Sequence, residues 1–189
     1  EAYYRGLRTA YVLPYMIQSE QFDSKTLLYV LSTFHHTAEH IRTVYARQGN
    51  HLLGEYASVF KNSLSFPEFK KAPEWREEAI VGVQKVMSQD MYSDGMNDEL
   101  VFSYHTMYTN LFYEFYELVK AGGHEDKLSE EFTSMLPKMY DVMSMVTNPD
   151  LSIPQFGDAW KRPGSLRRYY EAGSKRVPHG EELRYISSK

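Results

Sequence analysis

Four polar residues in two helical stretches of the chain could together perform proton-transfer chemistry. Asn50 and His51 follow a glycine between two amphipathic stretches, and Tyr104 and His105 are adjacent in a later one. An amide, two imidazoles and a phenol are the groups needed to remove a proton next to a carboxylate. The amide can donate hydrogen bonds to the carboxylate oxygens and so offset their charge. A tyrosine has an ordinary pKa of about 10, so its phenolate is a strong base and its phenol can protonate a departing oxygen.

This set of groups fits β-elimination from a uronic acid. In that reaction the C5 proton is removed and the glycosidic oxygen on C4 is expelled, and the carbanion forms only if the carboxylate is neutralised. A histidine beside the tyrosine favours the phenolate or shares its charge. The chemistry requires no metal and no organic cofactor. Taken alone, however, a Tyr-His pair in a tyrosine-rich helix is also typical of packing between helices.

A second motif points to different chemistry. His36, Glu39 and His40 match the H-x-x-E-H pattern of inverted zinc peptidases, in which two histidines on one helix face bind zinc and the glutamate acts as base. Glu114 or Glu117 could supply a third ligand. Those peptidases are mixed α/β proteins, whereas no stretch of this chain shows a strand pattern. We therefore expect no metal here and interpret these histidines as residues of a helix surface.

Composition limits the other classes of function. The chain has 189 residues, a net charge of −4 and no cysteine. The negative charge argues against nucleic acid as a partner, and the absence of cysteine excludes disulfides and thiol nucleophiles. No apolar run approaches the roughly 20 residues that cross a bilayer, so we expect no membrane partner. The sequence begins without Met and without a signal peptide, which suggests a piece of a longer protein.

The apolar spacing predicts an all-α protein made of antiparallel helical hairpins in one domain, residues 1–189. Asp23 is expected to cap the second helix, Gly49 to close it and Asn50 to open the third. Residues 92–96 are expected to form a turn in which Gly95 supplies the backbone freedom. Helices are predicted over residues 3–18, 25–48, 50–65, 73–91, 97–121, 127–146, 166–175 and 180–186.

Two segments carry a resemblance to a known family. "ARQGNHLLGEYASV" and "DGMNDELVFSYH", with Tyr104 lying 54 residues after Asn50, resemble the heparinase II/III superfamily. The resemblance is closest to the heparinase III type, the heparan-sulfate lyases of polysaccharide lyase family 12. It implies an incomplete α/α toroid, followed in the whole protein by a β-sandwich domain, with an acidic polysaccharide bound between them. It also implies a periplasmic or secreted enzyme.

The resemblance assigns roles to individual residues. Asn50 resembles the asparagine that neutralises the uronate carboxylate, and Tyr104 the catalytic tyrosine. His51 resembles a histidine that contacts substrate or supports catalysis. His105 is expected to bind substrate. Glu99 matches an acidic position of the motif and is expected to be a buried hydrogen-bonding anchor.

Further substrate contacts are predicted with alternatives left open. Arg47 and Trp160 are expected to bind substrate, but Arg47 could equally be an exposed helix charge and Trp160 a core residue. Arg42 and Lys61 have the same two interpretations as Arg47, and Trp75 has the same two as Trp160. A further catalytic histidine of the family comes from the β-sandwich domain, which this chain lacks, so the isolated chain is expected to be inactive. Heparan sulfate is the expected substrate, with other glycosaminoglycans or alginate next, and a non-catalytic carbohydrate-binding scaffold is the remaining alternative.

Overall fold

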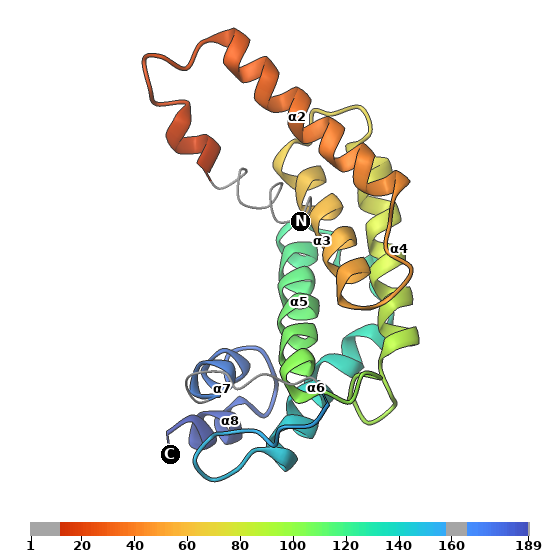
Figure 1. Cartoon of the computed structure of the whole chain (residues 1–189), viewed down its shortest axis with the longest axis vertical. Coiled ribbons are helices and arrows are strands. Elements are labelled where there is room, and N and C mark those ends of the chain that lie inside the picture. Colours follow the sequence, from red (N-terminus) through yellow and green to blue (C-terminus); the bar gives the residue numbers. More distant parts are fainter. Residues whose placement is uncertain (1–11, 158–165, 189) are drawn as a thin grey trace. The chain divides into compact units, whose positions relative to one another are not determined.

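The computed structural model of the chain describes residues 12–157 and 166–188. In these ranges every regular element is a helix, apart from one isolated antiparallel bridge between Met91 and Asn97. The predicted all-α class is therefore confirmed (Figure 1). The chain divides into two compact units, Glu1–Val83 and Gln84–Lys189, and each packs around its own buried side chains.

The first unit contains α2 (Ser24–Thr43), α3 (Gly49–Ser65) and the first part of α4 (Ala72–Asp90). Asp23 caps α2 as predicted, because its Oδ1 accepts a hydrogen bond from the Thr26 backbone N–H at 2.8 Å. α2 packs against α3. One buried cluster of this unit consists of Ala38, Ile41, Val59 and Trp75. Each helix thus contributes its apolar face to a common core.

The second unit contains α5 (Phe102–Ala121), a 3₁₀ turn η1 (Glu125–Lys127), α6 (Glu130–Val146), α7 (Arg167–Gly173) and α8 (Gly180–Ser187). α5 packs on α6, and the rings of Phe112 and Phe115 lie edge-on to the ring of Phe132. Ser129 caps α6 through a 3.1 Å hydrogen bond from the Phe132 backbone N–H. α7 and α8 pack together as a hairpin. Aromatic side chains therefore hold this unit together.

The connection between α2 and α3 differs from the prediction. α2 ends at Thr43, whereas the apolar pattern predicted a helix to residue 48, and α3 begins at Gly49 with Gln48 as its extended cap residue. The cause is a pair of contacts back to α3. The backbone N–H of Ala46 donates to Glu55 Oε2 at 2.7 Å, and the rings of Tyr45 and Tyr56 pack 4.5 Å apart.

The start of α5 also differs. The prediction began this helix at residue 97, but α5 begins at Phe102. Residues 97–101 instead close a turn against the end of α4: the Asp98 N–H donates to the Asp90 carbonyl at 2.8 Å. Leu100 takes a positive φ of 53° just before the helix. The apolar residues of this segment have helical spacing, but its backbone groups form turn hydrogen bonds instead of helical ones.

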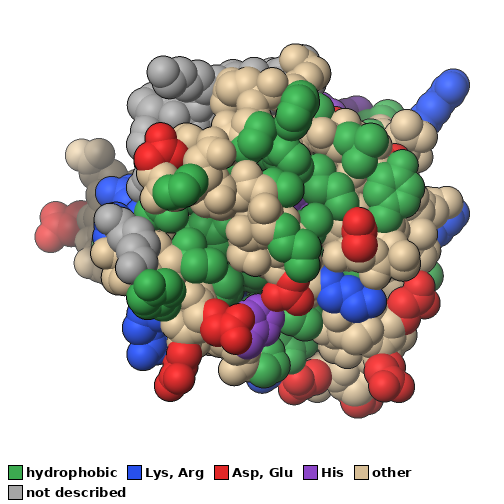
Figure 2. All heavy atoms as spheres, turned by 90° about the horizontal axis from the view of Figure 1, so that it is seen from below, with side chains coloured by type: hydrophobic (Ala, Val, Ile, Leu, Met, Phe, Trp, Pro, Cys, Tyr) green, Lys and Arg blue, Asp and Glu red, His purple; other side chains and the backbone are tan. Residues whose placement is uncertain are grey.

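Hydrophobic and acidic side chains share the exposed surface. Figure 2 shows hydrophobic side chains grouped near the middle of one face, seen from below, with several Asp and Glu side chains toward its lower border. Exposed large hydrophobic residues of the second unit include Leu100, Met145, Phe156 and Tyr185. Within the described ranges, no helix combines the length and the apolar character that crossing a membrane demands.

Candidate functional site

Asn50 and His51 lie in the first turn of α3. Gly49, the first residue of the helix, has a φ of 81°, a conformation that glycine adopts without strain. The Asn50 side chain is half-buried and that of His51 is exposed, whereas Leu52 and Leu53 behind them are buried. The two leucines anchor the turn in the core, so the amide and the imidazole are held at the end of a packed helix.

The segment before this turn is fixed by the contacts that end α2. The bond from Ala46 to Glu55 and the packing of Tyr45 on Tyr56 tie residues 45–46 to α3. Arg47, which follows them, is exposed. Gln48, the cap residue of α3, makes no side-chain hydrogen bond to the helix. The N-terminus of a helix carries a partial positive charge that attracts anions. The local geometry is thus suited to a carboxylate near Asn50 and His51.

Tyr104 lies in the equivalent place on another helix, the first turn of α5. The cap residue Val101 makes no side-chain hydrogen bond to the helix. The Tyr104 side chain is half-buried, and its sequence neighbours Ser103 and His105 are both fully buried. Both residues with the required chemistry, Asn50 and Tyr104, are therefore held in the first turn of a long helix.

His105 has a structural environment. Its Nε2 lies 2.8 Å from the Met139 carbonyl oxygen, and its Nδ1 accepts a 3.4 Å hydrogen bond from the Asn97 backbone N–H. A carbonyl only accepts and an N–H only donates, so the ring is neutral with its proton on Nε2. Burial lowers the pKa of His105 to about 4, against the opposing effects of the Met139 carbonyl and Asp94. With both nitrogens engaged inside the unit, the predicted substrate contact of His105 finds no support in this geometry.

Glu99 was predicted to be a buried hydrogen-bonding residue; it accepts a hydrogen bond, but its side chain is not buried. Its side chain is exposed, and its Oε1 lies 3.3 Å from the hydroxyl of Tyr108. The same hydroxyl lies 3.2 Å from Asp90 Oδ2. Burial, together with the two carboxylates, raises the pKa of Tyr108 well above its ordinary value. Tyr108 is thus a neutral phenol that joins the end of α4 to the loop before Tyr104.

Gly95 is required in its turn for two reasons. Its φ is 97°, and a Cβ at this position would lie 2.6 Å from the Lys138 backbone carbon. Only a glycine lets the loop lie against α6 at this distance. The loop carries Asn97, whose backbone N–H is bound by His105 and whose buried side-chain amide has no hydrogen-bond partner. Sequence reasoning did not single out Asp90 or Asn97, because polar residues around a glycine turn are equally typical of exposed loops.

The two tryptophans have different outcomes. Trp160 lies outside the described residues. Trp75 is fully buried in the core of the first unit, and its indole Nε1 donates to Glu39 Oε1 at 2.6 Å. The alternative of a sugar-stacking Trp75 is therefore wrong, and the core interpretation is confirmed.

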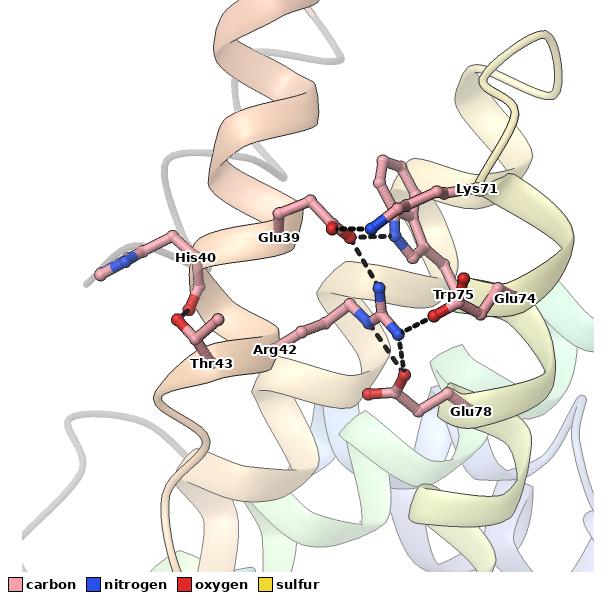
Figure 3. A network of polar contacts seen from close by, with 8 residues as sticks. All are labelled: Glu39, His40, Arg42, Thr43, Lys71, Glu74, Trp75 and Glu78. Atoms are coloured by element: carbon pink, nitrogen blue, oxygen red, sulfur yellow. Dashed lines mark hydrogen bonds and ion pairs between the residues drawn. The ribbon is translucent and has the colours of Figure 1, made fainter.

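Glu39 and Arg42 belong to an ion-pair network between α2 and α4 (Figure 3). Glu39 accepts from Lys71 and Trp75 as well as from Arg42 Nη1, at 2.6 Å for the last of these. Partial burial alone would raise the pKa of Glu39, but bonds from Lys71, Arg42 and Trp75 lower it to about 2.

This network bears on the zinc alternative. A carboxylate held by three donors is a poor general base. Among the described residues, no three His, Asp or Glu side chains are grouped as metal ligands. Arg42 is likewise occupied, because its guanidinium pairs with Glu39, Glu74 and Glu78. The H-x-x-E-H motif is thus part of a helix-to-helix contact.

Comparison with known proteins shows the family. The chain belongs to the heparinase II/III family, because the model for the Heparinase II/III N-terminus matches residues 4–185. It is 30% identical over 173 residues to a heparin-sulfate lyase of Pedobacter heparinus and 29% identical over 173 residues to one of Bacteroides stercoris. Each match covers 91% of this chain and 26% of the relative, so the chain spans about a quarter of those proteins.

Solved structures agree with this assignment. A crystal structure of heparinase III has a TM-score of 0.91 at 25% identity, over 98% of this chain and 30% of that one. Heparan sulfate lyase HepC from Pedobacter heparinus has a TM-score of 0.73 at 27% identity, over 90% of this chain and 27% of that one. The helical fold is therefore that of part of an α/α toroid, as the resemblance implied.

Proposed function

We propose that this chain is the N-terminal helical part of a lyase that cleaves a uronate-containing glycosaminoglycan by β-elimination, with heparan sulfate as its substrate. The match to heparin-sulfate lyases over 91% of the chain carries this proposal. The placement of Asn50 and Tyr104 in helix first turns, half-buried and ahead of packed helices, supports their roles.

Asn50 binds the uronate carboxylate in this proposal. Its amide donates hydrogen bonds to the carboxylate, and the positive end of α3 adds to the attraction. These bonds strengthen as negative charge moves from C5 onto the carboxylate in the transition state, so they lower the barrier. His51, exposed beside the amide, assists by contacting the same sugar.

Tyr104 transfers the proton. Its phenolate oxygen takes the C5 proton, the C5–H electron pair forms the C4–C5 double bond, and the C4–O bond breaks. The departing oxygen receives a proton, from the Tyr104 phenol where both groups lie on one face of the sugar. The products are a chain with a new reducing end, which keeps the departing oxygen as its C1 hydroxyl, and a chain that begins with an unsaturated uronate; no cofactor takes part.

The remaining parts of the proposal concern the whole protein. We infer that a C-terminal β-sandwich domain completes the cleft and supplies a further histidine, and that the protein is periplasmic or secreted. In this proposal Arg47, which is exposed next to the Asn50 turn, meets a sulfate or carboxylate of the polysaccharide.

The test is product formation by the full-length protein. Heparan sulfate should yield unsaturated uronate, detected by the ultraviolet absorbance of its conjugated double bond, whereas chondroitin sulfate and alginate should yield less. Asn50→Ala should lower kcat, while Asn148→Ala, a loop residue elsewhere, should not. Depolymerisation without ultraviolet absorbance would indicate hydrolysis and contradict the proposal. Binding without any depolymerisation would favour the non-catalytic scaffold.

A further inference from the structure

The second unit contains a groove of about 580 Å³ between the later part of α4 and the first half of α6. This volume is within the range of small-molecule sites, roughly 300–1,000 Å³. The floor is apolar and formed by buried Met87, Met91 and Phe132. None of the residues assigned above to catalysis lines it. The groove is thus a separate concave surface.

Hydrogen bonds made by residues that line the groove join its two sides. Gln84 Oε1 accepts from the Ser129 backbone N–H at 2.8 Å, and Gln84 Nε2 donates to the Lys127 carbonyl at 3.2 Å. Lys138 Nζ donates to the Ser93 carbonyl at 3.0 Å. Because these contacts join separate elements, they help to hold the two walls in place.

The rim carries hydroxyl and ammonium groups. Ser88 and Ser134 are exposed on opposite walls. The charged residues that line the groove are two lysines, Lys85 and Lys138, and one glutamate, Glu131. Among the described residues Lys85 has no ion-pair partner. The rim is therefore locally positive on a chain whose net charge is −4. A positive patch on an acidic protein selects for an anionic ligand.

We propose that this groove binds a stretch of acidic polysaccharide away from the bond that is cleaved. The apolar faces of the sugar rings would lie on the methionine and phenylalanine floor, the serine hydroxyls would meet sugar hydroxyls, and Lys85 and Lys138 would meet carboxylate or sulfate groups. This inference rests on the proposed substrate class but not on turnover.

Two variants of the full-length protein test the groove by different means. Lys85→Glu reverses a charge that supports no internal contact, and Lys25→Glu, an exposed lysine of α2, is its matched control. Ser134→Tyr fills the groove without changing charge. Both are made with Tyr104→Phe, which should slow turnover enough for binding to be measured, and are titrated calorimetrically with size-fractionated heparan sulfate oligosaccharides.

Lys85→Glu should weaken binding of long oligosaccharides by about fivefold, the size expected for an exposed ion pair turned repulsive, and raised salt should remove the difference. Ser134→Tyr should also weaken it, and Lys25→Glu should not. Unchanged affinity in both groove variants would overturn the inference, whether or not the parent protein is a lyase. Equal weakening for poly-glutamate would overturn the saccharide assignment, because it would show that the groove recognises only charge.

Discussion

His105 and Tyr104 are adjacent in the sequence, but their surroundings give them different tasks. Tyr104 is half-buried at a helix start, whereas His105 points into the unit and joins the loop at Asn97 to α6 at Met139. A sequence pattern can show that an imidazole follows a phenol, but not which of the two reaches solvent. We therefore interpret His105 as the residue that fixes the first turn of α5 and so the backbone of Tyr104.

His105 should make stability depend on pH. Its pKa is about 4 in the folded chain, below the ordinary value of 6.5, so the unfolded chain binds the proton more readily. The contribution of His105 to the free energy of unfolding is therefore complete above about pH 6.5. It should fall by up to about 3 kcal/mol as the pH drops toward 4. Urea unfolding of the 189-residue chain across this range measures it. His105→Gln should flatten this part of the profile and His40→Gln should not; an unchanged slope in His105→Gln would contradict the interpretation.

At the scale of elements, the sequence predicted which segments are helical better than where the helices end. The helix cap at Asp23 and the turn at Gly95 were predictable because each depends on residues next to it in the sequence. The end of α2 depends on Glu55, nine residues after Ala46, and the start of α5 depends on pairing with the end of α4. Such contacts end a helix early although the apolar spacing of the segment itself still looks helical.

Glu39 should contribute to stability by joining α2 to α4. Glu39→Gln removes the charge that Lys71, Arg42 and Trp75 face, so we expect a loss of about 2 kcal/mol in the free energy of unfolding. Glu74→Gln, which removes a more exposed partner of Arg42 alone, should cost less than about 1 kcal/mol.

The contribution of Glu39 also has a defined pH window. Its pKa is about 2 in the folded chain and 4.5 ordinarily, so the contribution is complete above about pH 4.5 and is lost as the pH falls toward 2. Equal effects of Glu39→Gln and Glu74→Gln in urea titrations at neutral pH would show that the network has no special role for Glu39.

Gly95 offers a test of the loop before α5. Gly95→Ala adds both the strain of a positive φ and a clash with the Lys138 backbone, so it should destabilise the chain by about 3 kcal/mol. Gly123→Ala is the matched control: its φ is also positive, at 73°, but a Cβ there meets nothing within 4 Å, so about 1 kcal/mol is expected. Thermal melts of the two variants separate the clash from the strain. Equal losses would mean that the loop moves away from α6 at little cost.

At the scale of the whole molecule, the fold class was predictable from the apolar spacing and the family from two short segments. Both features depend only on residues that are near one another in the sequence. Trp75 was left undecided because burial depends on three helices meeting. The chain spans about a quarter of its relatives, so a complete cleft is expected only in the full-length protein. The isolated 189-residue chain should therefore form no detectable unsaturated uronate from heparan sulfate. Robust product from this chain alone would contradict the two-domain site.

The central claim is that Tyr104 transfers the proton in a β-elimination, and Tyr104→Phe in the full-length protein tests it most directly. Turnover of heparan sulfate should fall by about 10²–10⁴-fold, because general acid–base catalysis supplies a factor of this size. Binding of the same oligosaccharide should be nearly unchanged, since the ring remains. Tyr185→Phe, which removes an exposed hydroxyl from α8, is the control and should retain full turnover. Turnover by Tyr104→Phe within a few-fold of the parent protein would contradict the account.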